Sequence, residues 1–394
     1  MSCPASRRVE VSARLPPTLT CPVRSIFCNW PWVRAGKWRL NQRSRRIPAS
    51  SSSTLRICSL DIKQPVLDSL GPFVTTFAPV SPMPSLFPHR HLLDIERLAR
   101  ADIEAVLALA AKYAEQNRKQ DKKIDLLRGR TVVNLFFENS TRTRTSFEIA
   151  AKRLGADVVN VPVELSSTKK GETVLDTVLT LDAMQIDALV IRHAEDGVPQ
   201  FLAPHVKAHV INAGDGKHEH PTQALLDALT IIRHKKKLEG LTIAICGDVA
   251  RSRVARSNIH LLKKFGANVR VVAPPEFITP DYKNFDVSIF HDLKKGVADA
   301  DVVMMLRIQH ERMGNDNFAA KTQEYAASYG LNHDVLESAK PDVIVMHPGP
   351  MNRGVEMTGE LADDPTYSVI REQVEMGVAV RMAVMDLLLS SGAK

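Results

Sequence analysis

Residues 241–274 read LTIAICGDVARSRVARSNIHLLKKFGANVRVVAP, and this stretch decides the fold. The apolar runs at 241–248 and 268–274 are typical of strands, and the segment between them gives helix signals. Ser252 stands where its side chain can cap that helix. A strand, a helix and a second strand in this order predict a parallel α/β unit.

The same alternation extends over most of the chain. Further strand-like runs lie at 131–137, 157–163, 187–193, 209–214, 301–306 and 342–348. The eight runs form two groups of four, separated by a helical stretch from about His220 to Leu238. The sequence therefore predicts two doubly wound parallel-sheet domains joined by a helix, with the last helix, from about Val369 to Leu389, packing back on the first domain.

The domain boundaries follow from this pattern. We expect a disordered basic extension at 1–82, a first domain at 83–233 completed by the C-terminal helix within 370–394, and a second domain at 234–369. The first domain should open with a helix pair or one long helix from Asp94 onward, for which Asp94 and Asp102 are candidate caps.

The net charge of +8 is concentrated at one end of the chain. Residues 1–82 hold twelve lysines and arginines against three acids, so the remaining residues together carry −1. The charge of the remaining residues therefore gives no support for a nucleic-acid partner. The sequence also contains no run of 18 or more apolar residues, which is the length needed to span a bilayer. The extension itself has three interpretations: a dispensable tail ahead of a start at Met83, an organellar transit peptide, or a basic binding tail.

The distribution of cysteines indicates a reducing compartment and does not predict a disulfide framework. Four of the five cysteines lie in the extension, which leaves Cys246 alone in the rest of the chain. A reducing cytoplasm suits such a protein, whereas a genuine transit peptide would place it in an organelle.

The strongest chemical signal is the segment from Phe136 to Arg144, in which a strand runs directly into a helix. Free backbone N–H groups and the positive end of the helix dipole attract an anion at such a turn. Ser140 and Thr141 add hydroxyl donors, and Arg142 can form two parallel bonds to phosphate oxygens. The alternative is an ordinary helix cap with arginines on the surface.

Three more residues stand at positions that face ligands in α/β proteins. Arg192 closes a strand at its carboxyl end, although an arginine there could instead pair on the surface. His220 opens a helix and Gln223 lies on the same face, although a histidine there is usually a cap. No G-x-G-x-x-G pattern and no metal-ligand spacing occurs, so neither a dinucleotide nor a metal is predicted.

On these residues the sequence resembles the aspartate/ornithine carbamoyltransferase family. The phosphate loop of that family, Ser-Thr-Arg-Thr-Arg, is matched by Ser140 to Arg144. The resemblance continues through ordered motifs at 166–172, 192–193, 220–227, 307–309 and 347–350, and only residues 1–82 fall outside it.

Within this family, the motifs at 169–172 and 307–309 resemble those of the members that use aspartate. His347-Pro348-Gly349-Pro350 stands where an ornithine-using member would have His-Cys-Leu-Pro. Aspartate brings two carboxylates that need cations, for which Lys170, Arg253 and Arg307 are candidates. Two alternatives to an aspartate-using enzyme stay open. One is a carbamoyltransferase that acts on another amine such as ornithine, and the other is a non-enzymatic binding protein with the same fold.

The resemblance implies transfer of a carbamoyl group from carbamoyl phosphate to L-aspartate, a step of pyrimidine biosynthesis, without cofactor or metal. It gives catalytic roles to Arg142, Thr143, Arg192 and His220. It assigns carbamoyl phosphate binding to Ser140, Thr141, Arg142, Thr143, Ser166, Arg192, His220, Gln223, Gly349 and Pro350. It assigns aspartate binding to Lys170, Arg253, Arg307 and Gln309.

The resemblance also implies contacts between domains and between chains. Glu138 would join the domains through Arg253 and Arg312, unless it pairs with an arginine of its own domain. A cis peptide would precede Pro350. The assembly would be a homotrimer with shared active sites, in which Ser166 and Lys170 of one chain reach into the site of its neighbour. Whether regulatory or dihydroorotase chains also bind is not determined by the sequence.

Overall fold

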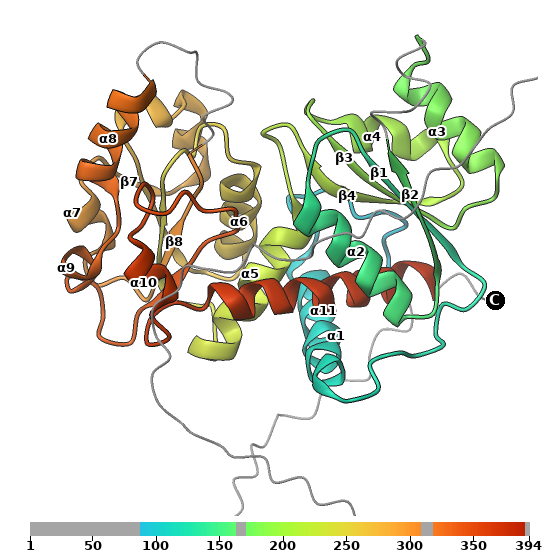
Figure 1. Ribbon diagram of the computed structural model, residues 1–394, viewed down its shortest axis with the longest axis horizontal. Coiled ribbons are helices and arrows are strands. Elements are labelled where there is room, and N and C mark those ends of the chain that lie inside the picture. Colours follow the sequence, from blue (N-terminus) through green and yellow to red (C-terminus); the bar gives the residue numbers. More distant parts are fainter. Residues whose placement is uncertain (1–86, 163–170, 309–317, 391–394) are drawn as a thin grey trace, which may run out of the picture. The chain divides into compact units, whose positions relative to one another are not determined.

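The computed structural model describes residues 87–162, 171–308 and 318–390 (Figure 1). Within these residues the strands form two separate parallel sheets, each with helices packed on its faces. The extension at 1–82 and the site predictions for Ser166, Lys170, Gln309 and Arg312 lie outside the described residues.

The first sheet has the strand order β2-β1-β3-β4. Its strands are β1 (Thr131–Phe136), β2 (Asp157–Pro162), β3 (Ala188–His193) and β4 (His209–Asp215). Both faces are covered: Val132 and Val190 belong to the large core cluster, whereas Val133 and Leu189 pack in a second cluster on the opposite face. Burial on both faces explains why the central strands β1 and β3 are almost continuously apolar, whereas the edge strand β2 is exposed or partly exposed at residues 157–161.

The second sheet has the order β7-β6-β5-β8-β9. Its strands are β5 (Thr242–Cys246), β6 (Asn268–Val272), β7 (Ser288–Phe290), β8 (Val302–Met305) and β9 (Ile344–Met346). The prediction of four strands was therefore wrong for this sheet. Strand β7 has three residues, pairs only with β6 at the sheet edge and is only partly buried, so it lacks the long apolar run that marks the others.

The helices alternate with the strands as predicted. Their bounds are α1 (Arg100–Arg118), α2 (Thr141–Arg153), α3 (Val174–Ala183), α4 (Val198–Leu202), α5 (Pro221–Lys235), α6 (Arg253–Lys264), α7 (Leu293–Val297), α8 (Phe318–Tyr329), α9 (His333–Leu336), α10 (Gly359–Asp363) and α11 (Ile370–Leu389). Short 3-10 helices lie at η3 (Ala203–His205), η4 (Pro275–Phe277) and η5 (Pro280–Phe285). As predicted, Ser252 caps α6 by accepting a hydrogen bond from the backbone N–H of Ala255.

Helix α1 begins later than the sequence suggested. The residue that caps this helix is Ala99. Asp102, the third residue of the helix, accepts a hydrogen bond of 3.0 Å from the backbone N–H of Ala99. Asp94 accepts from the backbone N–H of Arg97 at 2.9 Å, so it stabilises a separate turn ahead of the helix rather than the helix itself.

Two helices connect the sheets. Helix α5 follows β4 of the first sheet and precedes β5 of the second, as predicted. Helix α11 follows β9 of the second sheet and packs against α1, α2 and α5, which confirms that the last helix folds back on the first half of the chain (Figure 1). Among the residues that the structure describes, no helix combines the length and apolarity that a membrane crossing requires.

Candidate active site

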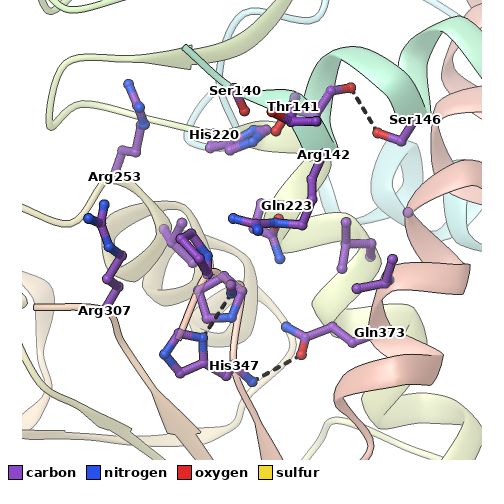
Figure 2. A pocket seen from close by; sticks show the side chains of 18 of the residues that line it. Ser140, Thr141, Arg142, Ser146, His220, Gln223, Arg253, Arg307, His347 and Gln373 are labelled. Carbon is purple, nitrogen blue, oxygen red and sulfur yellow. Dashed lines mark hydrogen bonds between the residues drawn. The ribbon is translucent and has the colours of Figure 1, made fainter. Parts of the chain in front are cut away.

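A cavity of about 600 Å³ opens at the carboxyl ends of strands from both sheets (Figure 2). Its walls come from the β1–α2 turn, the end of β3, the first turns of α5 and α6, the segments after β8 and β9, and one face of α11. Ligand sites of open α/β sheets lie at this edge, because the strands end there and the following helices begin there.

The cavity brings together most of the residues that the sequence singled out. The lining includes Glu138, Ser140, Thr141, Arg142, Thr143, Arg192, His220, Gln223, Arg253, Arg307, Gly349 and Pro350. All the predicted site residues that the structure describes are therefore in one place.

The β1–α2 turn has the hydrogen-bond donors that an anion site requires. Ser140 occupies the cap position of α2, and its side chain makes no capping hydrogen bond. The hydroxyl is thus not committed to the helix, unlike that of an ordinary cap, and the first N–H groups of α2 are also without helical partners. Arg142 extends from this turn toward the segment after β9, where a Cβ on Gly349 would lie 3.3 Å from its Nε atom. Partial burial lowers the pKa of Arg142, and the nearby charge of Arg307 lowers it further.

Glu138 stands between two arginines. One carboxylate oxygen lies 3.2 Å from Nε of Arg192 and 2.6 Å from Nη2 of Arg253, and all three side chains are largely buried. Arg192 belongs to β3 of the first sheet and Arg253 begins α6 beside the second. Glu138 therefore contacts both Arg192 of its own half and Arg253 of the other half. The two partners that the sequence left as alternatives are both present.

A glycine makes this arrangement possible. Gly214 lies at the end of β4 with φ +112°, where L side chains are strained. A Cβ there would lie 3.0 Å from Nε of Arg253 and 3.2 Å from Nη1 of Arg192. A larger residue would thus displace both arginines as well as strain the backbone.

His220 is a buried, uncharged imidazole. Its backbone N–H donates to Oγ of Ser257 at 2.8 Å, and its side chain does not cap α5 although it occupies the cap position. Burial, followed by the charges of Arg192, Arg381 and Arg253, holds the pKa of His220 well below its usual value. Within the described part of the chain its Nδ1 atom has no hydrogen-bond partner, which suits a role toward a ligand rather than toward the helix.

The segment after β9 closes the cavity. The Gly349–Pro350 peptide is cis, as expected, and the backbone N–H of Gly349 donates to Nδ1 of His347 at 2.8 Å. Burial, followed by Arg142 and Arg307, lowers the pKa of His347 to about 3. His347 is thus a neutral acceptor that fixes the turn of its own backbone.

Not every lining residue was predicted from the sequence, and two that were missed are polar residues of α11. Gln373 and Arg381 both come from α11 and are buried. They stand eight residues apart, hence on one face of the helix, and a polar pair on the apolar face is the signal that could have revealed them.

The cavity is strongly cationic. Five arginines line it, namely Arg142, Arg192, Arg253, Arg307 and Arg381, and of the described lining residues Glu138 is the one acid. Such a site is suited to two anionic ligands held side by side. In the described ranges no group of three His, Cys, Asp or Glu side chains could hold a metal ion.

The fold and the cavity define a class: a two-sheet α/β protein with a cationic cavity lined by residues from both halves. A sequence model of the carbamoyl-phosphate-binding domain of aspartate/ornithine carbamoyltransferases matches residues 90–233, and one of their Asp/Orn-binding domain matches residues 239–388. The chain belongs to the aspartate/ornithine carbamoyltransferase family.

Individual relatives agree with this assignment. The aspartate carbamoyltransferase catalytic subunit of Granulibacter bethesdensis is 61% identical over 302 residues, which cover 77% of this chain and 95% of that protein. Aspartate transcarbamoylase from Trypanosoma cruzi, solved with carbamoyl phosphate and aspartate, is 34% identical with a TM-score of 0.67, covering 76% of this chain and 96% of that one. Ornithine carbamoyltransferase from Pyrococcus furiosus is 31% identical with a TM-score of 0.69, covering 77% and 98%.

Proposed function

We propose that this chain is an enzyme that transfers the carbamoyl group of carbamoyl phosphate to the amine of L-aspartate, giving N-carbamoyl-L-aspartate and phosphate. The observation that carries the proposal is the set of five arginines around one cavity. Carbamoyl phosphate and aspartate are both anions, whereas the side chain of ornithine is a cation that such a site would repel. The relative at 61% identity, named for aspartate, favours the same substrate.

Carbamoyl phosphate is held mainly by the first half of the chain. Its phosphate rests on the turn from Ser140 to Thr143, where N–H groups, hydroxyls and Arg142 meet it. Its carbonyl oxygen lies near Thr143, Arg192 and His220. Gln223 and the backbone carbonyls of Gly349 and Pro350 accept hydrogen bonds from its NH₂ group.

Aspartate is held mainly by the second half. Arg253 and Arg307 pair with its carboxylates, together with Lys170 and Gln309 as the family resemblance implies. The aspartate nitrogen then attacks the carbonyl carbon, and Arg192, Thr143 and uncharged His220 stabilise the oxyanion of the tetrahedral intermediate. The C–O bond to phosphate breaks, and the leaving phosphate takes the proton that the amine loses.

The substrate is tested with a panel of amino-acid amines. With carbamoyl phosphate present, we expect phosphate release to depend on L-aspartate and to be negligible with L-ornithine. Detection of N-carbamoyl-L-aspartate by mass confirms that the carbamoyl group was transferred rather than hydrolysed. Release of phosphate with ornithine but not with aspartate would contradict the proposal.

The proposed assembly is a cytoplasmic homotrimer with shared sites, so that a monomer is inactive. We expect a Lys170→Ala chain and an Arg142→Ala chain each to be inactive alone but active after mixing. In a mixed trimer, about one site in three would join an intact Lys170 with an intact Arg142. Mixed trimers verified by mass that show no activity would contradict the shared site.

A further inference from the structure

Asp227 is a buried carboxylate next to the cavity; it ends the motif at 220–227, but no role in the site was assigned to it. It lies on α5, is fully buried, and does not itself line the cavity. Its Oδ1 accepts from Nε2 of Gln223 at 2.9 Å and from Nε2 of Gln373 at 2.6 Å. Its Oδ2 accepts from Nδ2 of Asn258 at 2.8 Å. One carboxylate thus joins α5, α11 and α6.

The other hydrogen bonds of these amides fix their orientations. Oε1 of Gln373 accepts from the backbone N–H of His347 at 3.0 Å, so its Nε2 must face Asp227. Nδ2 of Asn258 also donates to the carbonyl of Val254 at 3.0 Å, so this amide nitrogen, too, faces Asp227. Both oxygens of Asp227 therefore act as acceptors, as an ionised carboxylate does.

The same argument sets the orientation of Gln223. Because an acceptor-only carboxylate can bind its NH₂ group but not its carbonyl, Oε1 of Gln223 is turned away from Asp227. Gln223 lines the cavity, and Figure 2 shows its side chain among those of Arg142 and His220. An acceptor there suits the NH₂ group of a carbamoyl ligand, which can only donate.

We propose that Asp227 is a positioning residue that sets recognition of the carbamoyl NH₂ group. Asp227 turns the side-chain carbonyl of Gln223 toward the ligand. Through Gln373 it also holds the backbone at His347, and this backbone leads directly to the carbonyls of Gly349 and Pro350. The inference rests on the proposed function, because it assigns the determinant of the donor substrate in that same site.

The surroundings of Asp227 support this role. Arg381 on α11 is also buried, lies 4.9 Å from the ring centroid of Phe147 and supplies the positive charge that favours the ionised form of Asp227. A Cβ on Gly377 would lie 2.6 Å from Nη1 of Arg381, so the absence of a side chain there makes room for this charge. Burial raises the pKa of Asp227 to about 6, which leaves the carboxylate mainly ionised above neutral pH.

The test compares three ligands that differ only beyond the phosphate. Calorimetry would measure binding of carbamoyl phosphate, of acetyl phosphate, which has CH₃ in place of NH₂, and of inorganic phosphate. In Asp227→Leu we expect carbamoyl phosphate to bind about tenfold or more weakly, since two acceptors lose their orientation, and the other two ligands to bind within about twofold of the parent. Asp227→Asn keeps one carbonyl acceptor and should recover most of the difference.

Thr230→Val is the matched control. Thr230 is buried on the same helix and donates to the carbonyl of Leu226 at 2.8 Å, so this variant also loses a buried hydrogen bond but should bind all three ligands as the parent does. If Asp227→Leu fails to fold by circular dichroism, Gln373→Met removes the hydrogen bonds of Gln373 with Asp227 and with His347 but leaves that of Gln223 with Asp227. This variant should show a smaller loss, again for carbamoyl phosphate alone.

The outcomes separate this inference from the proposed function. Equal weakening of all three ligands, or unchanged carbamoyl phosphate binding, in a folded variant of an active parent would overturn the role of Asp227 and leave the function standing. A parent chain that neither binds carbamoyl phosphate nor carbamoylates aspartate would remove the proposed function itself.

Discussion

Replacing Arg192 with alanine should lower kcat by about 100- to 1000-fold, the effect of removing one donor to a developing oxyanion. Arg192 is the last residue but one of β3 and lies near uncharged His220. Its Nη1 donates to the carbonyl of Ala213 at 3.2 Å, which holds the guanidinium in place before any ligand binds. The phosphate turn from Ser140 to Thr143 is untouched, so binding of inorganic phosphate should change little. Steady-state kinetics and calorimetry with phosphate measure the two quantities separately.

Arg130→Ala provides the control for this variant. Arg130 directly precedes β1 of the same sheet and pairs with Asp187 at 2.7 Å, away from the residues that line the cavity. Its loss should leave kcat near that of the parent, because a surface ion pair contributes little. A kcat of Arg192→Ala equal to that of the control would remove Arg192 from the catalytic role.

Replacing Glu138 with glutamine should raise the KM for aspartate and lower kcat, each by about tenfold. Glu138 is the one described acid of the cavity lining and contacts Arg253 of the second half, so we infer that it helps to hold the halves together once both substrates are bound. A partly buried charge-assisted hydrogen bond contributes roughly 1.5–3 kcal/mol, enough to shift an open–closed equilibrium by that factor. Carbamoyl phosphate should still bind the free enzyme nearly as before.

The contact of Glu138 with Arg192 makes the opposite outcome meaningful. If the carboxylate serves mainly to orient Arg192 in its own half, Glu138→Gln should weaken carbamoyl phosphate binding and leave the aspartate KM unchanged. Glu148→Gln is the control, since Glu148 lies on α2 and pairs with Lys152 at 2.6 Å on the surface. Calorimetry with carbamoyl phosphate alone, beside aspartate saturation kinetics, decides between these roles.

Local patterns in the sequence determined the class of fold and the centre of the site. Eight strands were predicted because each is a short apolar run, and the turn at Ser140 to Thr143 was predicted as an anion site because a strand followed at once by hydroxyls and arginines is a short-range signal. The cap at Ser252 and the place of Arg192 at the end of β3 are equally local. The family resemblance, rather than any local pattern, assigned aspartate binding to Arg253.

Only the tertiary structure decided how these local pieces meet. Strand β7 exists because β6 offers an edge, not because its three residues demand it. Glu138 and Arg253 are 115 residues apart, and Asp227 and Gln373 are 146 apart, so no helical or strand period relates them. Helix α11 shows a buried glutamine and a buried arginine whose partners, Asp227 and the ring of Phe147, lie on α5 and α2. The direction of the hydrogen bonds and the balance of charge inside the site depend on such long-range contacts. Helical and strand periods relate only residues that are near in the sequence, so these contacts could not be predicted from a sequence pattern.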